Sequence, residues 1–143
     1  MKLNKGTFMS NTEAEKKLYE LALEHGVLVG SQGLGLGKNN SDYDYIIDYN
    51  LITKALEGFN INSLSKTNAR GYFNVLPPLG NCYRITFRIN TCTYDLICFP
   101  SNDYVEKARL AFEDLKCVPL YMLEDKQIRI LLFEKALKSR FSE

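Results

Sequence analysis

One short stretch of the chain combines glycine, serine and acidic residues at spacings that suit phosphate and metal chemistry. Gly30 and Ser31 follow an apolar run, and ten residues later come Asp42 and Asp44. Glycine lets the backbone approach a ligand closely, and a serine at the start of a helix favours phosphate. Asp42 and Asp44 are two apart on a predicted strand, so both carboxylates point to one face. Such a pair repels unless a cation lies between them, and Mg²⁺ shares oxygen ligands of this kind with substrate phosphates.

Two common phosphate-binding motifs do not fit this stretch. A Walker loop would need glycine in place of Gln32 and a hydroxyl residue in place of Asn39. A dinucleotide fingerprint would need glycine in place of Lys38 or Asn40. The remaining pattern is a strand, a Gly-Ser turn, and an Asp-x-Asp pair that enters the next strand.

The elements around this stretch are expected to form one α+β domain over residues 1–143, with a core over about 11–99. Capping residues and apolar periodicity predict helices over 10–24, 51–56, 104–115 and 124–140. Runs of β-forming residues predict strands over 27–29, 43–49, 72–76, 83–89 and 92–99, and the polar segment 62–70 is predicted as a loop. The expected architecture is a mixed sheet with helices packed on one side and two C-terminal helices over about 101–141.

Two finer predictions concern side-chain direction. On the last helix, the pattern indicates a buried side formed by Ile128, Leu131, Leu132 and Leu137. Between the strands over 83–89 and 92–99, a two-residue turn would place Thr86 opposite Asp95. Arg84, Thr86 and Arg88 would then share a face with Thr93, Asp95 and Ile97.

Composition excludes several classes of protein. The 143 residues include 18 Lys and Arg and 17 Asp and Glu, a net charge of +1 that does not suit a polycation that binds nucleic acid by bulk charge. No apolar run approaches the roughly 18–20 residues that span a bilayer, so no membrane association is expected. Four cysteines without a Cys-x-x-Cys pair, together with one histidine, do not suit a structural zinc site. Free thiols and a cytoplasmic location are expected.

The combination of Gly30-Ser31, ten residues, and Asp42-x-Asp44 resembles the signature of the DNA polymerase β-like nucleotidyltransferase superfamily, in its minimal nucleotidyltransferase type. The family usually carries a third carboxylate on a later strand, and Asp95 inside an apolar strand fits that position. The resemblance covers residues 27–99, about half of the chain. One departure is Leu34, which stands where members often carry arginine.

The resemblance implies a nucleotidyltransferase fold and the transfer of a nucleoside monophosphate from an NTP, with ATP expected, to a hydroxyl with release of pyrophosphate. It implies two Mg²⁺ ions, with Mn²⁺ as the alternative, held by Asp42, Asp44 and Asp95, the last of which also helps to deprotonate the acceptor. Contacts to the nucleotide are expected from a set of small and basic residues: Gly30, Ser31, Gly35, Lys38, Ser41, Arg84 and Arg88. The expected acceptor is a hydroxyl of a protein (for example a toxin), of an RNA or of a small molecule. A homodimer is one expected assembly.

Other interpretations of the same residues stay open at this level. Asp42 and Asp44 also suit a solvated turn, because the residues before them have typical turn composition. Arg84 and Arg88 also suit an exposed strand face. The alternative function is a catalytically silent module of the same fold that binds a nucleotide or a protein, as an antitoxin would. A weaker alternative is an interaction protein without a nucleotide site.

Overall fold

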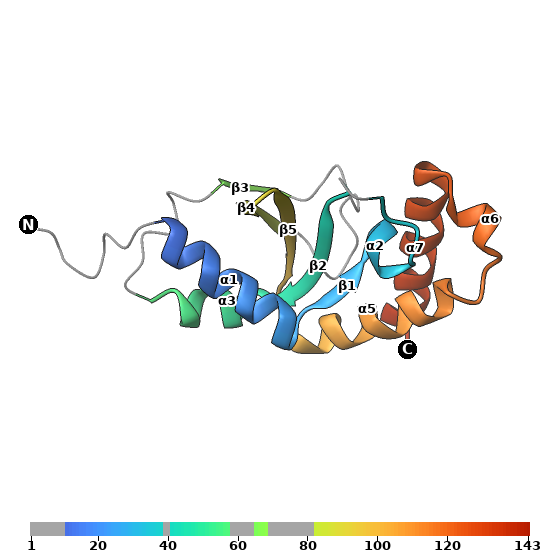
Figure 1. Ribbon diagram of the computed structural model, residues 1–143. Helices are drawn as coiled ribbons and strands as arrows, with labels where there is room; N and C mark the ends of the chain where they lie inside the picture. Colours follow the sequence, from blue (N-terminus) through green and yellow to red (C-terminus); the bar gives the residue numbers. More distant parts are fainter. Residues whose placement is uncertain (1–10, 39–40, 58–64, 69–81) are drawn as a thin grey trace, which may run out of the picture.

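The computed structural model describes residues 11–38, 41–57, 65–68 and 82–143 (Figure 1). Its elements follow in the order α1 (Asn11–His25), β1 (Val27–Val29), α2 (Gly30–Gly33), β2 (Tyr43–Asp48), α3 (Tyr49–Ala55), β3 (Ser65–Asn68), β4 (Tyr83–Ile89), β5 (Cys92–Phe99), α5 (Asn102–Leu115), α6 (Leu120–Leu123) and α7 (Lys126–Phe141). The fold is α+β with a mixed sheet, as predicted from the sequence. Even α7, with its 16 residues, falls short of the length and apolarity needed to cross a membrane, as do the other described helices.

The sheet has five strands in the order β1-β2-β5-β4-β3. β2 and β5 run parallel at its centre, and the other neighbouring strands pair antiparallel. A parallel pair needs a long crossover connection, and here the crossover contains α3, β3 and β4. The central parallel strands are therefore flanked on both sides by strands that run the other way.

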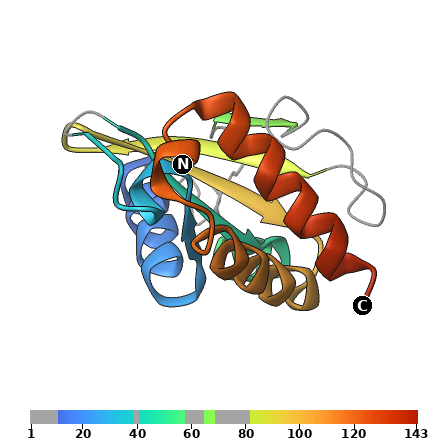
Figure 2. The same ribbon diagram turned by 90° about the vertical axis from the view of Figure 1, so that its right-hand side faces the viewer.

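Helices cover both faces of the sheet, so the expectation of helices packed on one side is wrong (Figure 1). α1 and α3 pack on one face over a core that includes Leu18, Ile47 and Leu96. The C-terminal helices pack on the opposite face over a second core that includes Ile46, Phe99 and Leu137. Figure 2 shows α5 and α7 side by side in front of the strands. The side chains of β2 and β5 therefore alternate between two buried faces, which explains their nearly continuous apolar sequence.

Most predicted elements agree with the structure within a residue or two, with one clear error. The sequence predicts a loop over 62–70, but Ser65–Asn68 forms β3 and pairs antiparallel with β4. Its polar sequence suits an edge strand, which is paired on one side only. β2 ends one residue early, because the side chain of Asp48 accepts a hydrogen bond from Asn50 N at 2.9 Å and caps α3. The predicted strand over 72–76 and the predicted cap at Ser10 lie outside the described residues.

The predicted buried side of the last helix is partly wrong. Leu137 is fully buried, but Ile128 is 42% exposed and Leu131 is 63% exposed. The helix instead turns Phe133 and Leu137 into the core between α5 and the sheet. Because apolar residues occur on more than one side of this helix, their pattern does not single out the buried face.

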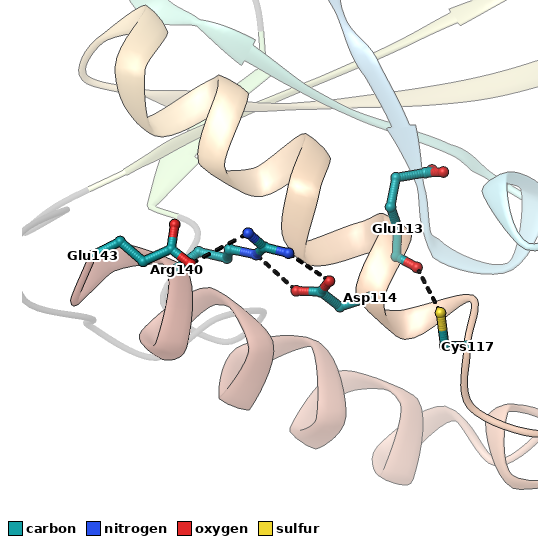
Figure 3. A network of polar contacts seen from close by, with 5 residues as sticks. All are labelled: Glu113, Asp114, Cys117, Arg140 and Glu143. Atoms are coloured by element: carbon teal, nitrogen blue, oxygen red, sulfur yellow. Dashed lines mark hydrogen bonds and ion pairs between the residues drawn. The ribbon is translucent and has the colours of Figure 1, made fainter.

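An ion pair ties α7 to α5 near the C-terminus (Figure 3). The guanidinium of Arg140 donates from Nε and Nη2 to the two carboxylate oxygens of Asp114, at 2.8 and 2.7 Å. Hydrogen bonds from Arg140 lower the pKa of Asp114, against the opposing effect of burial, and the positive charge of Arg140 lowers it further. The two-pronged geometry matches the shape of a guanidinium to that of a carboxylate.

This ion pair predicts a pH dependence of stability. The pKa of folded Asp114 lies below its ordinary value of 3.8, so the stabilisation is complete above that value and is lost as the pH falls through the folded-state pKa. Urea unfolding of the wild type should therefore show a free energy of unfolding that falls as the pH is lowered from about 4 through the folded-state pKa of Asp114. Asp114→Asn should show a smaller fall over that range, and an equal fall in both proteins would contradict the assignment.

Candidate active site

Two carboxylates lie next to each other in the middle of the sheet. Asp44 of β2 is in register with Asp95 of β5, and Asp95 is in register with Thr86 of β4. On the other side, Asp44 is in register with Val29 of β1. Residues that are directly opposite on neighbouring strands point to the same face. Because Val29 belongs to the core under the C-terminal helices, Asp44 and Asp95 point toward that side too.

The expected hairpin geometry around Asp95 is confirmed. Ile89 pairs with Cys92, and Asn90 in the turn between them has a φ of 57°, as a tight two-residue turn requires. The hydroxyl of Thr86 donates a hydrogen bond to Oδ1 of Asp95 at 2.5 Å. This bond holds the carboxylate in one orientation.

A cavity of about 410 Å³ opens where these carboxylates reach the edge of the second core. Such a volume is typical of pockets for small molecules. Among the described residues, the acidic ones in its wall are Asp42, Asp44 and Asp95. The basic ones are Arg84, Lys126 and Arg129. The small residues in the wall are Gly30, Ser31 and Ser41. The apolar residues in the wall are Phe112, Leu115, Ile130 and Phe133.

The Gly-Ser turn reaches this cavity directly from β1. Gly30 has a φ of 69°, a left-handed conformation that favours glycine, and it begins the one-turn helix α2. Gly33 at the other end of α2 packs tightly, since an added Cβ would lie 2.5 Å from the carbonyl oxygen of Leu28. The glycines at both ends of the turn are therefore explained by backbone conformation and close packing, and the turn places Ser31 in the cavity wall.

A side chain that the sequence motif does not include organises the loop before Asp42. Gln32 Nε2 donates to the carbonyl oxygens of Lys38 and Ser41, at 3.4 and 3.3 Å. Lys38 N in turn donates to Ser41 Oγ at 2.8 Å, and Ser41 N donates to the carbonyl of Lys38 at 2.9 Å. These bonds fix the residue that immediately precedes Asp42. A polar residue inside the Gly-rich segment is the only sequence signal for this role.

Most, but not all, of the predicted site residues line the cavity. Gly35, Lys38 and Arg88 do not contribute to the cavity wall. Arg88 is exposed and donates to the carbonyl of Thr91 at the hairpin end, at 3.5 Å. Arg84 does line the cavity, and its Nε is buried without a hydrogen-bond partner among the described residues. A buried donor of this kind is costly unless a ligand satisfies it.

Two basic residues of α7 join the site without having been predicted for it. Lys126 and Arg129 line the cavity together with Ile130 and Phe133 of the same helix. Their sequence positions carry no motif, and only the packing of α7 over the sheet brings them to the carboxylates. The wall thus combines acidic side chains from the sheet with basic side chains from α7.

The chemistry of the acidic residues fits a hard divalent cation, for which carboxylate oxygens are the preferred ligands. Asp44 and Asp95 are neighbours on parallel strands, and Asp42 lines the same cavity. In the described part of the chain, no three acidic, His or Cys side chains are close enough as they stand to hold an ion together. Asp42 is exposed, whereas Asp44 and Asp95 are half-buried.

The chain was also compared with known proteins. Family models, curated proteins and solved structures gave no match.

Proposed function

We propose that this protein is a metal-dependent nucleotidyltransferase, which transfers a nucleoside monophosphate from an NTP to a hydroxyl group and releases pyrophosphate. One observation carries the proposal: Asp95, about 50 residues further along the chain, lines the same cavity as Gly30, Ser31, Asp42 and Asp44. These are the residues on which the resemblance to the DNA polymerase β-like superfamily depends.

Each of these residues has a definable task in such a transfer. Asp42, Asp44 and Asp95 would hold Mg²⁺, which when bound neutralises phosphate charge. Gly30 and Ser31 offer backbone N–H and hydroxyl groups to the outer phosphates. Arg84, with its buried Nε, offers a further donor to a phosphate oxygen.

The transfer requires a base that accepts the proton of the acceptor hydroxyl. As the acceptor oxygen forms its bond to the α-phosphorus, the bond from that phosphorus to the bridging oxygen breaks, and pyrophosphate leaves with the electron pair. Asp95 can accept the hydroxyl proton as a general base. The hydrogen bond from Thr86 keeps its carboxylate oriented for this transfer. The second oxygen of Asp95 can then face the acceptor.

The direct test is transfer of label. The purified protein is incubated with each of the four α-labelled ribonucleoside triphosphates, Mg²⁺ and a cell extract that supplies acceptors. We expect a labelled product together with release of pyrophosphate, and the loss of both when EDTA removes the metal. Mn²⁺ should restore the reaction after EDTA treatment.

Other results would redirect the assignment. NTP binding without label transfer or pyrophosphate release would contradict the enzyme and support the silent binding module of the same fold. If none of the NTPs with Mg²⁺ raised the melting temperature of the protein, nucleotide binding itself would be contradicted, because a ligand that binds the folded state stabilises it.

A further inference from the structure

We propose that α7 supplies a cationic wall for the triphosphate through Lys126 and Arg129, so that the nucleotide lies between the sheet and this helix. The inference rests on the proposed function, since it names the part of the nucleotide that these residues recognise. It goes beyond the sequence motif, which reaches no further than β5 and contains no residue of α7.

The position of these residues on the helix supports the inference. Lys126, Arg129, Ile130 and Phe133 are spaced by three, four and seven residues along α7, which places them on one side of a helix. All four line the cavity. Phe133 anchors this side in the core, so the two basic side chains are held on the side of α7 that faces the carboxylates.

The end of α7 itself does not provide the anion site. Its first turn is capped by Asp125, whose Oδ1 accepts hydrogen bonds from Gln127 N and Ile128 N at 2.9 and 3.1 Å. The free N–H groups that would attract a phosphate at a helix start are thus partly satisfied within the chain. We therefore assign the contribution of α7 to its side chains.

Among the described residues, the Arg129 guanidinium makes one hydrogen bond, which holds it in place and leaves most of its donors available. Its Nη1 donates to the carbonyl oxygen of Leu123 at 2.8 Å, and Leu123 is fully buried at the end of α6. A guanidinium group has five N–H donors. A fixed guanidinium with remaining donors in the cavity wall suits phosphate oxygens.

Charge balance gives the physical reason for a second basic element. Three carboxylates and a triphosphate together carry more negative charge than two divalent cations neutralise. Arg84, Lys126 and Arg129 face this excess from β4 and from α7, and they equal in number the three carboxylates in the described wall. Phosphoryl transfer depends on such electrostatic complementarity.

The experiment measures binding rather than turnover, with three probes, two cavity variants and one control variant. Calorimetry compares Mg²⁺-ATP, Mg²⁺ with inorganic tripolyphosphate, and adenosine, on Lys126→Ala and Arg129→Ala. Lys135→Ala is the matched control, because Lys135 is an exposed lysine of the same helix that does not line the cavity. We expect each cavity variant to bind Mg²⁺-ATP and tripolyphosphate about tenfold more weakly, with adenosine binding unchanged, and Lys135→Ala to match the wild type.

Each outcome bears on one of the two proposals. Equal tripolyphosphate affinity for Lys126→Ala, Lys135→Ala and the wild type would overturn the inference, even if label transfer by the wild type supported the enzyme. Weaker tripolyphosphate binding by both cavity variants, without label transfer by the wild type, would support the inference and contradict the transferase. Arg129→Ala also loses its bond to Leu123, so its melting temperature is measured without ligand to show whether it is folded. If Arg129→Ala is unfolded, the tripolyphosphate affinity of Lys126→Ala tests the inference alone.

Discussion

Replacing Asp44 by Asn is expected to lower the rate of nucleotidyl transfer by about a thousandfold, which corresponds to about 4 kcal/mol of transition-state stabilisation. Asp44 lies beside Asp95 on the neighbouring parallel strand, within the cavity wall. An amide keeps the shape of the side chain but removes the charge that would hold a divalent cation. The measurement is label transfer from an α-labelled NTP, together with thermal unfolding to show that the variant is folded.

The control for this prediction is Asp103→Asn, the same chemical change at an exposed position in the first turn of α5. Its transfer rate should stay close to that of the wild type. If Asp44→Asn does not fold, Asp95→Asn provides the same test on the neighbouring strand. Transfer at the wild-type rate by a folded Asp44→Asn would show that this carboxylate does not take part in the chemistry.

Local patterns in the sequence are sufficient to predict much of the sheet. The hairpin between β4 and β5 can be derived because a two-residue turn fixes the register of both strands. The turn alone therefore places Thr86 opposite Asp95, and this pairing is confirmed. The faces of the two strands follow from strict alternation, with Ile85 and Phe87 in the core.

Pairings between distant segments cannot be derived in this way. The parallel register of β2 with β5, which brings Asp44 to Asp95, joins strands about 50 residues apart, and no turn fixes it. Only the family resemblance points to it. β3 is missed for a related reason: its residues are polar, so the sequence resembles a loop, and only its pairing with β4 identifies it as a strand.

The basic residues that α7 contributes to the cavity cannot be predicted from local sequence patterns, for the same physical reason. Lys126 and Arg129 enter the site because α7 crosses the sheet beside the carboxylates. The crossing depends on how Phe133 and Leu137 pack against α5 and the sheet. A helix with apolar residues on several sides gives little information about this orientation.

From the orientation of α7 we predict that loss of one of its buried side chains lowers the stability of the protein substantially. Leu137→Ala should lower the free energy of unfolding by about 2–5 kcal/mol, because it removes a fully buried side chain and leaves a cavity. A domain of this size has a total stability of about 5–15 kcal/mol, so the loss should be evident in urea unfolding. α7 contributes Lys126 to the cavity, so loosening this helix should also weaken Mg²⁺-ATP binding.

Leu131→Ala provides the matched control, since it makes the same substitution six residues earlier on the same helix. Leu131 is 63% exposed, so its replacement should change the free energy of unfolding by no more than about 0.5 kcal/mol. The sequence pattern alone predicts that both leucines are buried and would give both variants a large effect. Comparable destabilisation by the two substitutions would therefore contradict the observed orientation of α7, and with it the placement of Lys126 and Arg129 opposite the carboxylates.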